Sequence, residues 1–282
     1  MALFEKVNPN HPDKVADRIG GALVDRAYSI RPDAIMAAEV LIGHGKCHII
    51  AETNIHITQA EVEAIVHRIA GWNMEVDYQE HEQDGELAKN QRELHCGDNG
   101  IFAGVPTDGE ESELTIIARE LYDRFKTDGK YIINGNDLII CQSNAEDEEI
   151  IKTIEKALPE PYKYNLVINP LGYWTGGTDV DTGAINRKLG SDMGRGLTGG
   201  GLHGKDLTKA DVSINIYAHM LAHLYGHRIE CVCSIGDTKF EVIDTEDGTK
   251  EWCDFKEACA VASKYIDNLG GFEKFAEWGL VR

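Results

Sequence analysis

Helical and strand-like patterns alternate along this chain, and the alternation limits its fold more than any other feature. Residues 13–29 carry apolar side chains at the spacing of one helical face. Thr58, with Glu61 three residues later, predicts a capping box at the start of another helix. Around these helices we predict strands at 34–43, 46–53 and 74–78. The first part of the chain is therefore expected to pack helices beside a small sheet.

The rest of the chain continues this alternation after a polar stretch at 79–94, which we predict to be a loop. Helices are predicted near 110–125, 147–158, 208–225 and 254–268, and strands within 130–142 and at 164–169, 228–236 and 239–244. Because no low-complexity linker divides the chain, we predict three α+β units that pack as one body. Their predicted ranges are 1–88, 89–163 and 164–282.

The acidic composition excludes some classes of partner. The formal net charge is -20, and such a chain repels nucleic acids and anionic membranes. An anionic ligand such as ATP would need basic side chains gathered locally, together with metal ions. No run approaches the ~20 apolar residues of a membrane helix, and the N-terminus lacks the apolar core of a signal peptide. We therefore expect a soluble, cytoplasmic protein.

Neither the cysteines nor the histidines predict a metal site. The seven cysteines form no C-x-x-C pair, and Cys231 and Cys233 alternate on a predicted strand, where they share one face. We interpret them as reduced, mostly buried thiols and expect no structural zinc. His219, His223 and His227 lie four residues apart, and we interpret them as a helix surface because no acidic partner stands at matching spacing.

The HPDK motif at 11–14 stands directly before the first predicted helix. Asp13 is well placed to be the N-cap, and capping alone would explain it. An imidazole, a carboxylate and a cation at the positive end of a helix also suit phosphate and metal binding. A second short motif, GDNG at 97–100, is by itself a turn sequence.

The run from Asn169 to Asp211 is rich in glycine and basic residues and is too long for a plain connector. Glycine lets backbone amides approach a phosphate and lysine supplies charge, so we predict an anion-binding segment. GGGLHGKD at 199–206 lacks the Ser or Thr of a P-loop. Neither it nor GRGLTG at 194–199 follows an apolar strand, so we treat both matches as accidental.

Four motifs, in order along the chain, resemble the methionine adenosyltransferase family. Residues 11–28 are similar to the family's N-terminal signature, and residues 37–53 to its next strand pair. GDNGIFAG at 97–104 resembles a central segment, and the NP, GG, RK, GGG and GKD elements within 169–213 resemble a long glycine-rich signature. The resemblance implies an α+β fold of three similar units around a pseudo-threefold axis. It also implies dimers with active sites at the subunit interface.

The resemblance assigns roles residue by residue. ATP and phosphate contacts fall on His11, Asp128, Lys130, Asp181, Arg187, Lys188, Lys205 and Lys209. Of these, the residues with catalytic roles would be His11, Lys130, Arg187 and Lys205. Methionine contacts fall on Glu52, Gln91 and Asp98. Asp13 and Asp211 would hold the two Mg²⁺ ions of a site, and Glu39 would bind K⁺.

The implied reaction forms S-adenosylmethionine from ATP and L-methionine. The sulfur attacks C5′, and the triphosphate leaves and is then hydrolysed to phosphate and pyrophosphate. A neutral sulfur needs no base, so the protein has to align the reactants and stabilise the leaving triphosphate. His11 would donate a hydrogen bond to the leaving oxygen. The expected assembly is a homodimer or a dimer of dimers, with no nucleic acid and no membrane as partner.

Departures from the family pattern keep two alternatives open. The chain is shorter than typical members, and the stretch before Asp98, where members carry a mobile gate, is cut down. Val212 stands where the family has arginine, and Asn99 stands where it has glutamine. The alternatives are a metal-dependent triphosphatase or nucleotide-alkylating relative, and a non-catalytic partner subunit. Retention of both metal aspartates, Asp13 and Asp211, argues against the second alternative.

Overall fold

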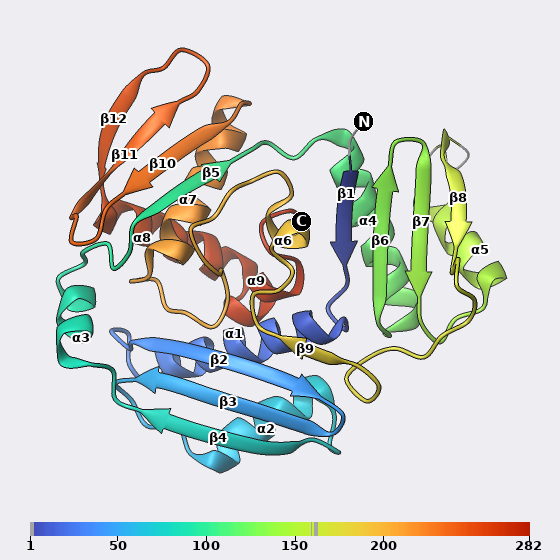
Figure 1. The fold of residues 1–282 in the computed structure, drawn as a ribbon, viewed down its shortest axis with the longest axis horizontal. Helices are drawn as coiled ribbons and strands as arrows, with labels where there is room; N and C mark the ends of the chain where they lie inside the picture. Colours follow the sequence, from blue (N-terminus) through green and yellow to red (C-terminus); the bar gives the residue numbers. More distant parts are fainter. Residues whose placement is uncertain (1–2, 159, 161–162) are drawn as a thin grey trace.

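Three times along the chain, a helix is followed by an antiparallel two-stranded hairpin. The structure is a computed structural model that describes residues 3–158, 160 and 163–282 (Figure 1). The first repeat consists of α1 (Pro12–Ile30), β2 (Met36–Gly43), β3 (Lys46–Thr53), α2 (Gln59–Ala70) and β4 (Glu75–His81). The second consists of α4 (Gly109–Phe125), β6 (Gly129–Asn134), β7 (Asp137–Gln142), α5 (Asp147–Ala157) and β8 (Asn165–Ile168).

The third repeat departs from the other two after its hairpin. It consists of α7 (Ala210–Tyr225), β10 (Ile229–Cys233), β11 (Lys239–Asp244), β12 (Lys250–Asp254) and α8 (Phe255–Leu269), with α9 (Phe272–Trp278) after it. In the first two repeats a helix leads into the last strand, which pairs parallel to the hairpin. In the third, a short turn joins β11 to β12, so these two strands pair antiparallel.

Each repeat supplies an edge strand to the sheet of the next repeat. β1 (Leu3–Val7) precedes α1 but pairs with β6, and β5 (Gly100–Gly104) precedes α4 but pairs with β10. β9 (Thr182–Ala184) precedes α7 and pairs with β2. The three sheets therefore run β9-β2-β3-β4, β1-β6-β7-β8 and β5-β10-β11-β12. This cyclic exchange confirms the predicted α+β fold of three similar units around a pseudo-threefold axis.

The exchanged strands cross the predicted unit ranges. The sheet that holds the hairpin of 89–163 takes β1 from 1–88 and β8 from 164–282, and the other two sheets also take a strand from outside their range. The boundaries 1–88, 89–163 and 164–282 remain a proposal about where the repeats begin. The repeats nevertheless pack against one another, because α9 at the end of the chain packs on α1 of the first repeat.

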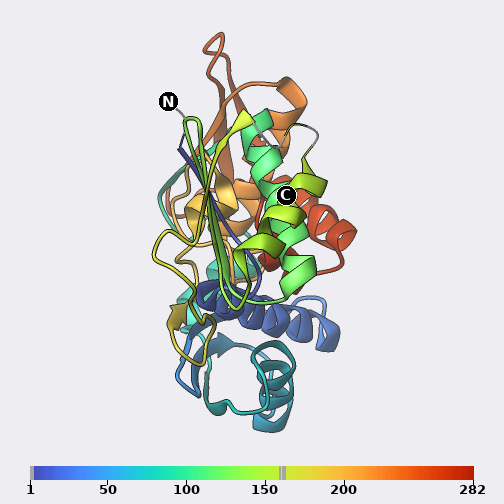
Figure 2. The same cartoon turned by 90° about the vertical axis from the view of Figure 1, so that its right-hand side faces the viewer.

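Helices cover one side of the sheets and leave the other side open. Figure 2 shows most helices on one side of the three sheets. In β3, side chains alternate between exposed and buried along the strand, as expected for one packed face and one open face. Separate hydrophobic cores fill the space between each sheet and its helices, and α1 belongs to the largest of them. Among the described residues, no helix combines the length and the apolar content needed to cross a membrane.

The polar stretch 79–94 is not a loop, contrary to our prediction. β4 continues to His81, and a short helix α3 (Gly85–Arg92) follows, with the Asp84 side chain accepting hydrogen bonds from the Glu86 and Leu87 amides. The buried side chains of α3 are those of Ala88 and Gln91, so the helix has no apolar stripe that a sequence pattern could reveal. A short helix α6 (Leu189–Met193) also interrupts the glycine-rich run.

Candidate active site

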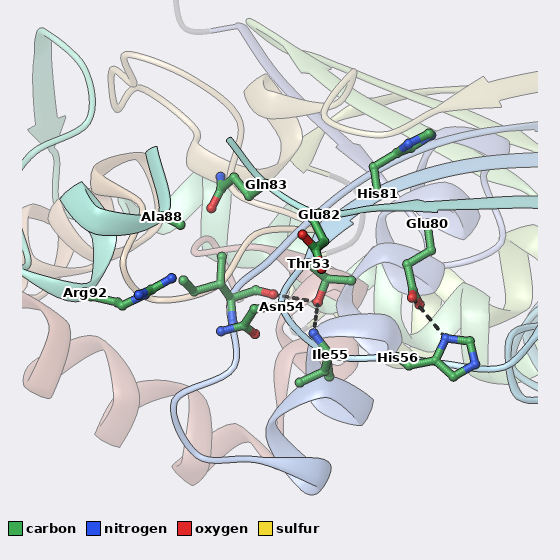
Figure 3. A pocket seen from close by; sticks show the side chains of 11 residues that line it. Thr53, Asn54, Ile55, His56, Glu80, His81, Glu82, Gln83, Ala88 and Arg92 are labelled. Atoms are coloured by element: carbon green, nitrogen blue, oxygen red, sulfur yellow. Dashed lines mark hydrogen bonds and ion pairs between the residues drawn. The ribbon is translucent and has the colours of Figure 1, made fainter. Parts of the chain in front are cut away.

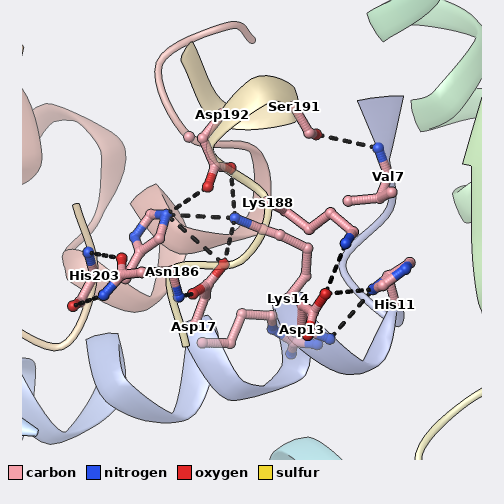
Figure 4. A network of polar contacts seen from close by, with 12 residues as sticks. Val7, His11, Asp13, Lys14, Asp17, Asn186, Lys188, Ser191, Asp192 and His203 are labelled. Atoms are coloured by element: carbon pink, nitrogen blue, oxygen red, sulfur yellow. Dashed lines mark hydrogen bonds and ion pairs between the residues drawn. The ribbon is translucent and has the colours of Figure 1, made fainter. Parts of the chain in front are cut away.

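Asp13 lies in the first turn of α1 and is not its N-cap, contrary to our prediction. The N-cap is His11, whose Nδ1 accepts a hydrogen bond from the Asp13 amide at 3.2 Å. The Asp13 carboxylate is buried, and it accepts hydrogen bonds from the Ala184 amide at 2.8 Å and from Lys188 Nζ at 2.7 Å (Figure 4). Gly183 makes this contact possible because a Cβ there would overlap the Pro12 carbonyl.

The surroundings of His11 and Asp13 set their charge. Burial and the positive charge of Lys188 lower the pKa of His11 to about 4, so the imidazole is neutral at pH 7. Since Nδ1 accepts a hydrogen bond, the proton of the neutral ring is on Nε2, which can donate. Burial opposes ionisation of Asp13, but its bonds to Lys188 and the Ala184 amide outweigh this and lower its pKa. The site therefore holds a carboxylate and a neutral imidazole donor side by side.

Five more of the predicted residues gather around this turn. Arg187 Nη1 lies 4.0 Å from Asp13 Oδ1, and Lys130 pairs with Glu5 on the neighbouring strand at 2.7 Å. The charges of Lys130 and Asp181 act on His11, and those of Asp13, Asp181 and Lys188 act on Asp128. We call this group the α1 cluster: His11, Asp13, Asp128, Lys130, Asp181, Arg187 and Lys188.

Asp128 is a buried carboxyl group with an incomplete set of partners. Its Oδ2 accepts a hydrogen bond from the Gly177 amide at 3.2 Å, but its buried Oδ1 has no hydrogen-bond partner. Burial, followed by repulsion from Asp181 and Asp13, raises the pKa of Asp128 to about 7. The free oxygen can accept a hydrogen bond from a bound hydroxyl group, which suits the predicted contact to a nucleoside.

The raised pKa of Asp128 predicts a pH-dependent stability. Between about pH 4 and pH 7 the folded chain holds a proton on Asp128 that the unfolded chain has lost, so stability falls as the pH rises. Asp128→Asn removes this dependence. As the pH rises from 5 to 8, the free energy of unfolding of Asp128→Asn is expected to increase by about 2–3 kcal/mol relative to that of the wild type. Urea unfolding of both proteins at the two pH values measures the difference.

Asp123→Asn is the matched control for this measurement, because Asp123 is exposed and pairs with Lys126 on the surface. The difference in free energy of unfolding between Asp123→Asn and the wild type should stay constant within ~0.5 kcal/mol between the two pH values. An equally constant difference for Asp128→Asn would show that Asp128 ionises normally in the folded chain.

The remaining predicted residues, apart from Glu39, gather at the start of α7. Lys205 Nζ donates to Asp211 Oδ2 at 2.7 Å, and Gly200 lies so close to this carboxylate that a Cβ there would overlap it. A cavity of about 210 Å³ opens beside the pair and is lined by Gln91, Asp98 and Lys209, among others. We call this group the α7 cluster: Glu52, Gln91, Asp98, Lys205, Lys209 and Asp211.

The α7 cluster contains groups suited to a polar ligand. Gln91 is 5% exposed, and its buried Oε1 has no hydrogen-bond partner. Lys209 is the N-cap of α7, and burial lowers its pKa while the carboxylates of Asp206 and Glu52 act in the opposite direction. A ligand with an ammonium and a carboxylate group, such as an amino acid, could satisfy both kinds of partner.

Within one chain, the two described clusters share no direct polar contact. Among the described residues, no hydrogen bond or ion pair joins a side chain of the α1 cluster to one of the α7 cluster. Glu39 belongs to neither. It is exposed on the open face of β2, two residues from Ala37, which pairs with Glu52. Potassium binding by Glu39 stays a prediction.

A further hollow lies beside α3, at the ends of β3 and β4 (Figure 3). It measures about 440 Å³ and is lined by His56, Glu80 and Arg92, among others. His56 Nδ1 lies 3.0 Å from Glu80 Oε1, so this pair is already satisfied. None of the predicted site residues lines the hollow. Ala88 and Arg92 of α3 do, so no atoms of the described residues pack against this side of the helix where the hollow lies.

Two residues near the α1 cluster were not predicted. Glu5 on β1 neutralises Lys130. The ring of Trp174 stands beside Asp128, since a Cβ added at Gly176 would touch both side chains. Trp174 Nε1 donates to Asn169 Oδ1 at 3.2 Å, which fixes the ring. The aromatic pair Tyr173-Trp174 within the glycine-rich run could have indicated a ligand contact, because a partly exposed ring beside a polar pocket suits a flat ligand.

Comparisons with known proteins agree with the resemblance. The S-adenosylmethionine synthetase N-terminal domain matches residues 2–94. The S-adenosylmethionine synthase of Paramagnetospirillum magneticum is 27% identical over 275 residues, which cover 77% of this chain and 71% of that protein. The synthase of Zymomonas mobilis is 26% identical over 282 residues, with the same coverage.

A solved structure shows the same fold over nearly the whole chain. It is described as an unusual S-adenosylmethionine synthetase from Campylobacter jejuni, and it superposes with a TM-score of 0.77 at 20% identity. The match covers 99% of this chain and 94% of that one. Motif order, the N-terminal domain match, the related sequences and the fold agree. The chain is therefore similar to S-adenosylmethionine synthetases in its N-terminal part, in its sequence and in its fold.

Proposed function

We propose that this protein is a methionine adenosyltransferase, which forms S-adenosylmethionine from ATP and L-methionine and then hydrolyses the triphosphate. The observation that supports this best is a pair of similar arrangements at two helix starts. Asp13 in the first turn of α1 pairs with Lys188, and Asp211 in the first turn of α7 pairs with Lys205. Each arrangement offers a carboxylate for a cation and an ammonium for a phosphate.

The α1 cluster would hold the nucleotide. Asp128 has a free acceptor oxygen for a ribose hydroxyl, and the ring of Trp174 beside it could stack on the base. Arg187 and Lys188 would offset the charge that gathers on the leaving triphosphate. The neutral His11 would donate its Nε2 proton as a hydrogen bond to the leaving oxygen. No side chain has to remove a proton, because the attacking sulfur carries none.

The α7 cluster would hold methionine and the far side of the polyphosphate. Gln91 and Asp98 line its cavity, and Lys205 and Lys209 bring two positive charges. α3 covers one side of this cavity and has the hollow of Figure 3 behind it. Because few of its side chains are buried, α3 could move to admit the substrate, as a short counterpart of the family's gate.

We propose a homodimer, or a dimer of dimers, in which the α1 cluster of one subunit completes the α7 cluster of the other. The described residues of the two clusters share no hydrogen bond or ion pair within one chain, and the proposed reaction needs both clusters. Glu52 lies on the open face of its sheet next to Ile50, and Glu5 lies on β1 near Leu3. Ile50 is 52% exposed and Leu3 is 69% exposed, so apolar surface adjoins each cluster.

The residues present fit magnesium. Mg²⁺ prefers hard oxygen ligands, and Asp13 and Asp211 each supply a carboxylate that is now held by a lysine. When bound, magnesium would neutralise the polyphosphate and leave both lysines free to contact phosphate oxygens. Potassium binding at Glu39 remains a proposal, and the exposed Glu39 carboxylate would supply one oxygen ligand. All seven cysteines are free thiols, which supports our proposal of a cytoplasmic location.

The experiment that tests the function is incubation of the purified protein with ATP, methionine, magnesium and potassium, followed by mass detection of S-adenosylmethionine. We expect the product to appear together with phosphate and pyrophosphate. ATP or triphosphate hydrolysis that does not depend on methionine, without S-adenosylmethionine, would favour a metal-dependent triphosphatase. A protein that is inert under every metal condition would point to a non-catalytic partner subunit.

A further inference from the structure

A fully buried ionic network lies one turn into α1, beside the α1 cluster (Figure 4). Lys14 Nζ donates to Asp192 Oδ1 at 2.6 Å and lies 3.0 Å from Asp17 Oδ2. His203 Nε2 lies 3.0 Å from Asp192 Oδ2 and 3.4 Å from Lys14 Nζ. These four side chains come from α1, from α6 and from the segment that precedes α7.

This network is not an empty metal site. Asp17, Asp192 and His203 bring ligand atoms within 4.8 Å of one another. The Lys14 ammonium lies among them, where a metal cation would otherwise sit. Burial opposes the charge of Lys14, but the carboxylates of Asp17 and Asp192 outweigh it and raise the pKa of Lys14. Burial likewise opposes the charge of Asp192, but Lys14 and His203 lower its pKa. The lysine is therefore a built-in cation.

Asn186 connects this network to two backbone segments. Its backbone amide donates to Asp17 Oδ1 at 2.7 Å, and its side-chain Nδ2 donates to the His203 carbonyl at 3.1 Å. The same side chain accepts from the His203 amide at 2.9 Å. Asn186 has a φ of 61°, a left-handed conformation that asparagine tolerates better than most residues. The segments around Asn186 and His203 are thus joined to each other and to α1.

The two joined segments carry basic residues of both clusters. Arg187 and Lys188 of the α1 cluster directly follow Asn186, and Lys205 of the α7 cluster lies two residues after His203. Asp13, the partner of Lys188, directly precedes Lys14. A disturbance of the network would therefore displace ligands in both clusters at once.

We propose that Asn186 and His203 are positioning residues that set the basic side chains of both clusters through the buried Lys14 network. Neither residue needs to touch a substrate. The proposal rests on the proposed function in one respect, that the residues so placed are those that bind the polyphosphate. In the dimer described above, each chain would thereby fix parts of two different active sites.

Three variants separate positioning from simple packing. His203→Phe keeps a ring against Phe275, whose centroid lies 5.2 Å away, but removes the N–H that faces Asp192. His203→Gln retains an N–H donor and should rescue part of the effect. Asn186→Gly permits the positive φ but removes both side-chain bonds to His203. His227→Phe is the matched control, since His227 pairs with Asp244 far from both clusters.

Amide hydrogen exchange of the free protein tests the network without any turnover. In His203→Phe and Asn186→Gly we expect exchange within 184–190 and within 198–206 to accelerate together, by about tenfold, with a smaller change in His203→Gln. His227→Phe should leave both segments unchanged. Acceleration of one segment alone, or equal acceleration throughout the described chain, would overturn the proposal.

Kinetics of the wild type and the variants test the link to function. Well below the thermal midpoint of each variant, we expect the KM for ATP to rise about tenfold in His203→Phe, with kcat changing less. A lower thermal midpoint with an unchanged KM would show a structural role only and contradict the proposal. If the wild type makes no S-adenosylmethionine, the proposed function fails, while the exchange experiment still decides whether the network positions both segments.

Discussion

Asp13→Asn is expected to reduce S-adenosylmethionine formation by at least roughly a thousandfold, because it removes the negative charge that would hold magnesium on the α1 cluster. Asparagine can still accept a hydrogen bond from the Ala184 amide, but it presents no charge to Lys188. The expected loss of stability is about 1–3 kcal/mol, which a folded domain should survive. Product formation is measured by mass, and folding by thermal unfolding.

Asp25→Asn provides the matched control in the same helix. The Asp25 carboxylate accepts two backbone hydrogen bonds, from the Phe272 and Glu273 amides at 2.7 and 2.9 Å, and it lies outside both clusters. Its product formation should stay within about threefold of the wild type. Full activity in Asp13→Asn would mean that this carboxylate has no part in the reaction, and the assignment of the α1 cluster would have to be abandoned.

The local elements of this fold could be predicted from the sequence because their signals are local. The apolar face of α1 and the alternation in β3 each repeat over several residues, and both elements lie where the patterns placed them. The capping box of Thr58 and Glu61 at the start of α2 is also confirmed. The wrong N-cap at α1 was a local error, since His11 and Asp13 both have side chains that can cap.

The exchanged strands could not be predicted because their partners are remote. β1, β5 and β9 are three to five residues long, and each pairs with a hairpin from another repeat. In β1 a lysine also occupies a buried position, so the strand lacks the alternation of apolar and polar residues that a half-buried strand would show. Lys6 is fully buried, and its Nζ donates to the carbonyls of Ser191 and Trp278 at 2.8 Å each. A buried lysine whose Nζ donates to distant carbonyls has no signature in a short sequence window.

The sequence also could not separate the predicted site residues into two clusters. All of them carry plausible chemistry for one polyphosphate, and only the fold shows that Lys188 and Lys205 belong to different groups. Asn186 and His203 could not be predicted for the opposite reason. They follow no catalytic motif, and their contacts become evident only when the two segments of the glycine-rich run are seen side by side.

Mixing two inactive variants is expected to restore activity, because a site completed across the dimer interface needs one cluster from each chain. Asp13→Asn damages the α1 cluster, and Lys205→Met damages the α7 cluster, where the lysine holds Asp211. In a mixed dimer one site combines both defects, while the other combines two intact clusters. Random pairing of equal amounts should therefore restore roughly a quarter of the wild-type activity, and dimers purified through two different tags roughly half.

Asp13→Asn mixed with Lys188→Met is the matched control, since both substitutions fall in the α1 cluster. Each site of that mixed dimer contains one damaged α1 cluster, so no activity should return. If each chain held a complete site of its own, neither mixture would recover, because every chain would carry a defect. A failure of the two tagged chains to purify together would exclude the dimer itself. Recovery in the first mixture alone is the one result that a site shared between subunits predicts.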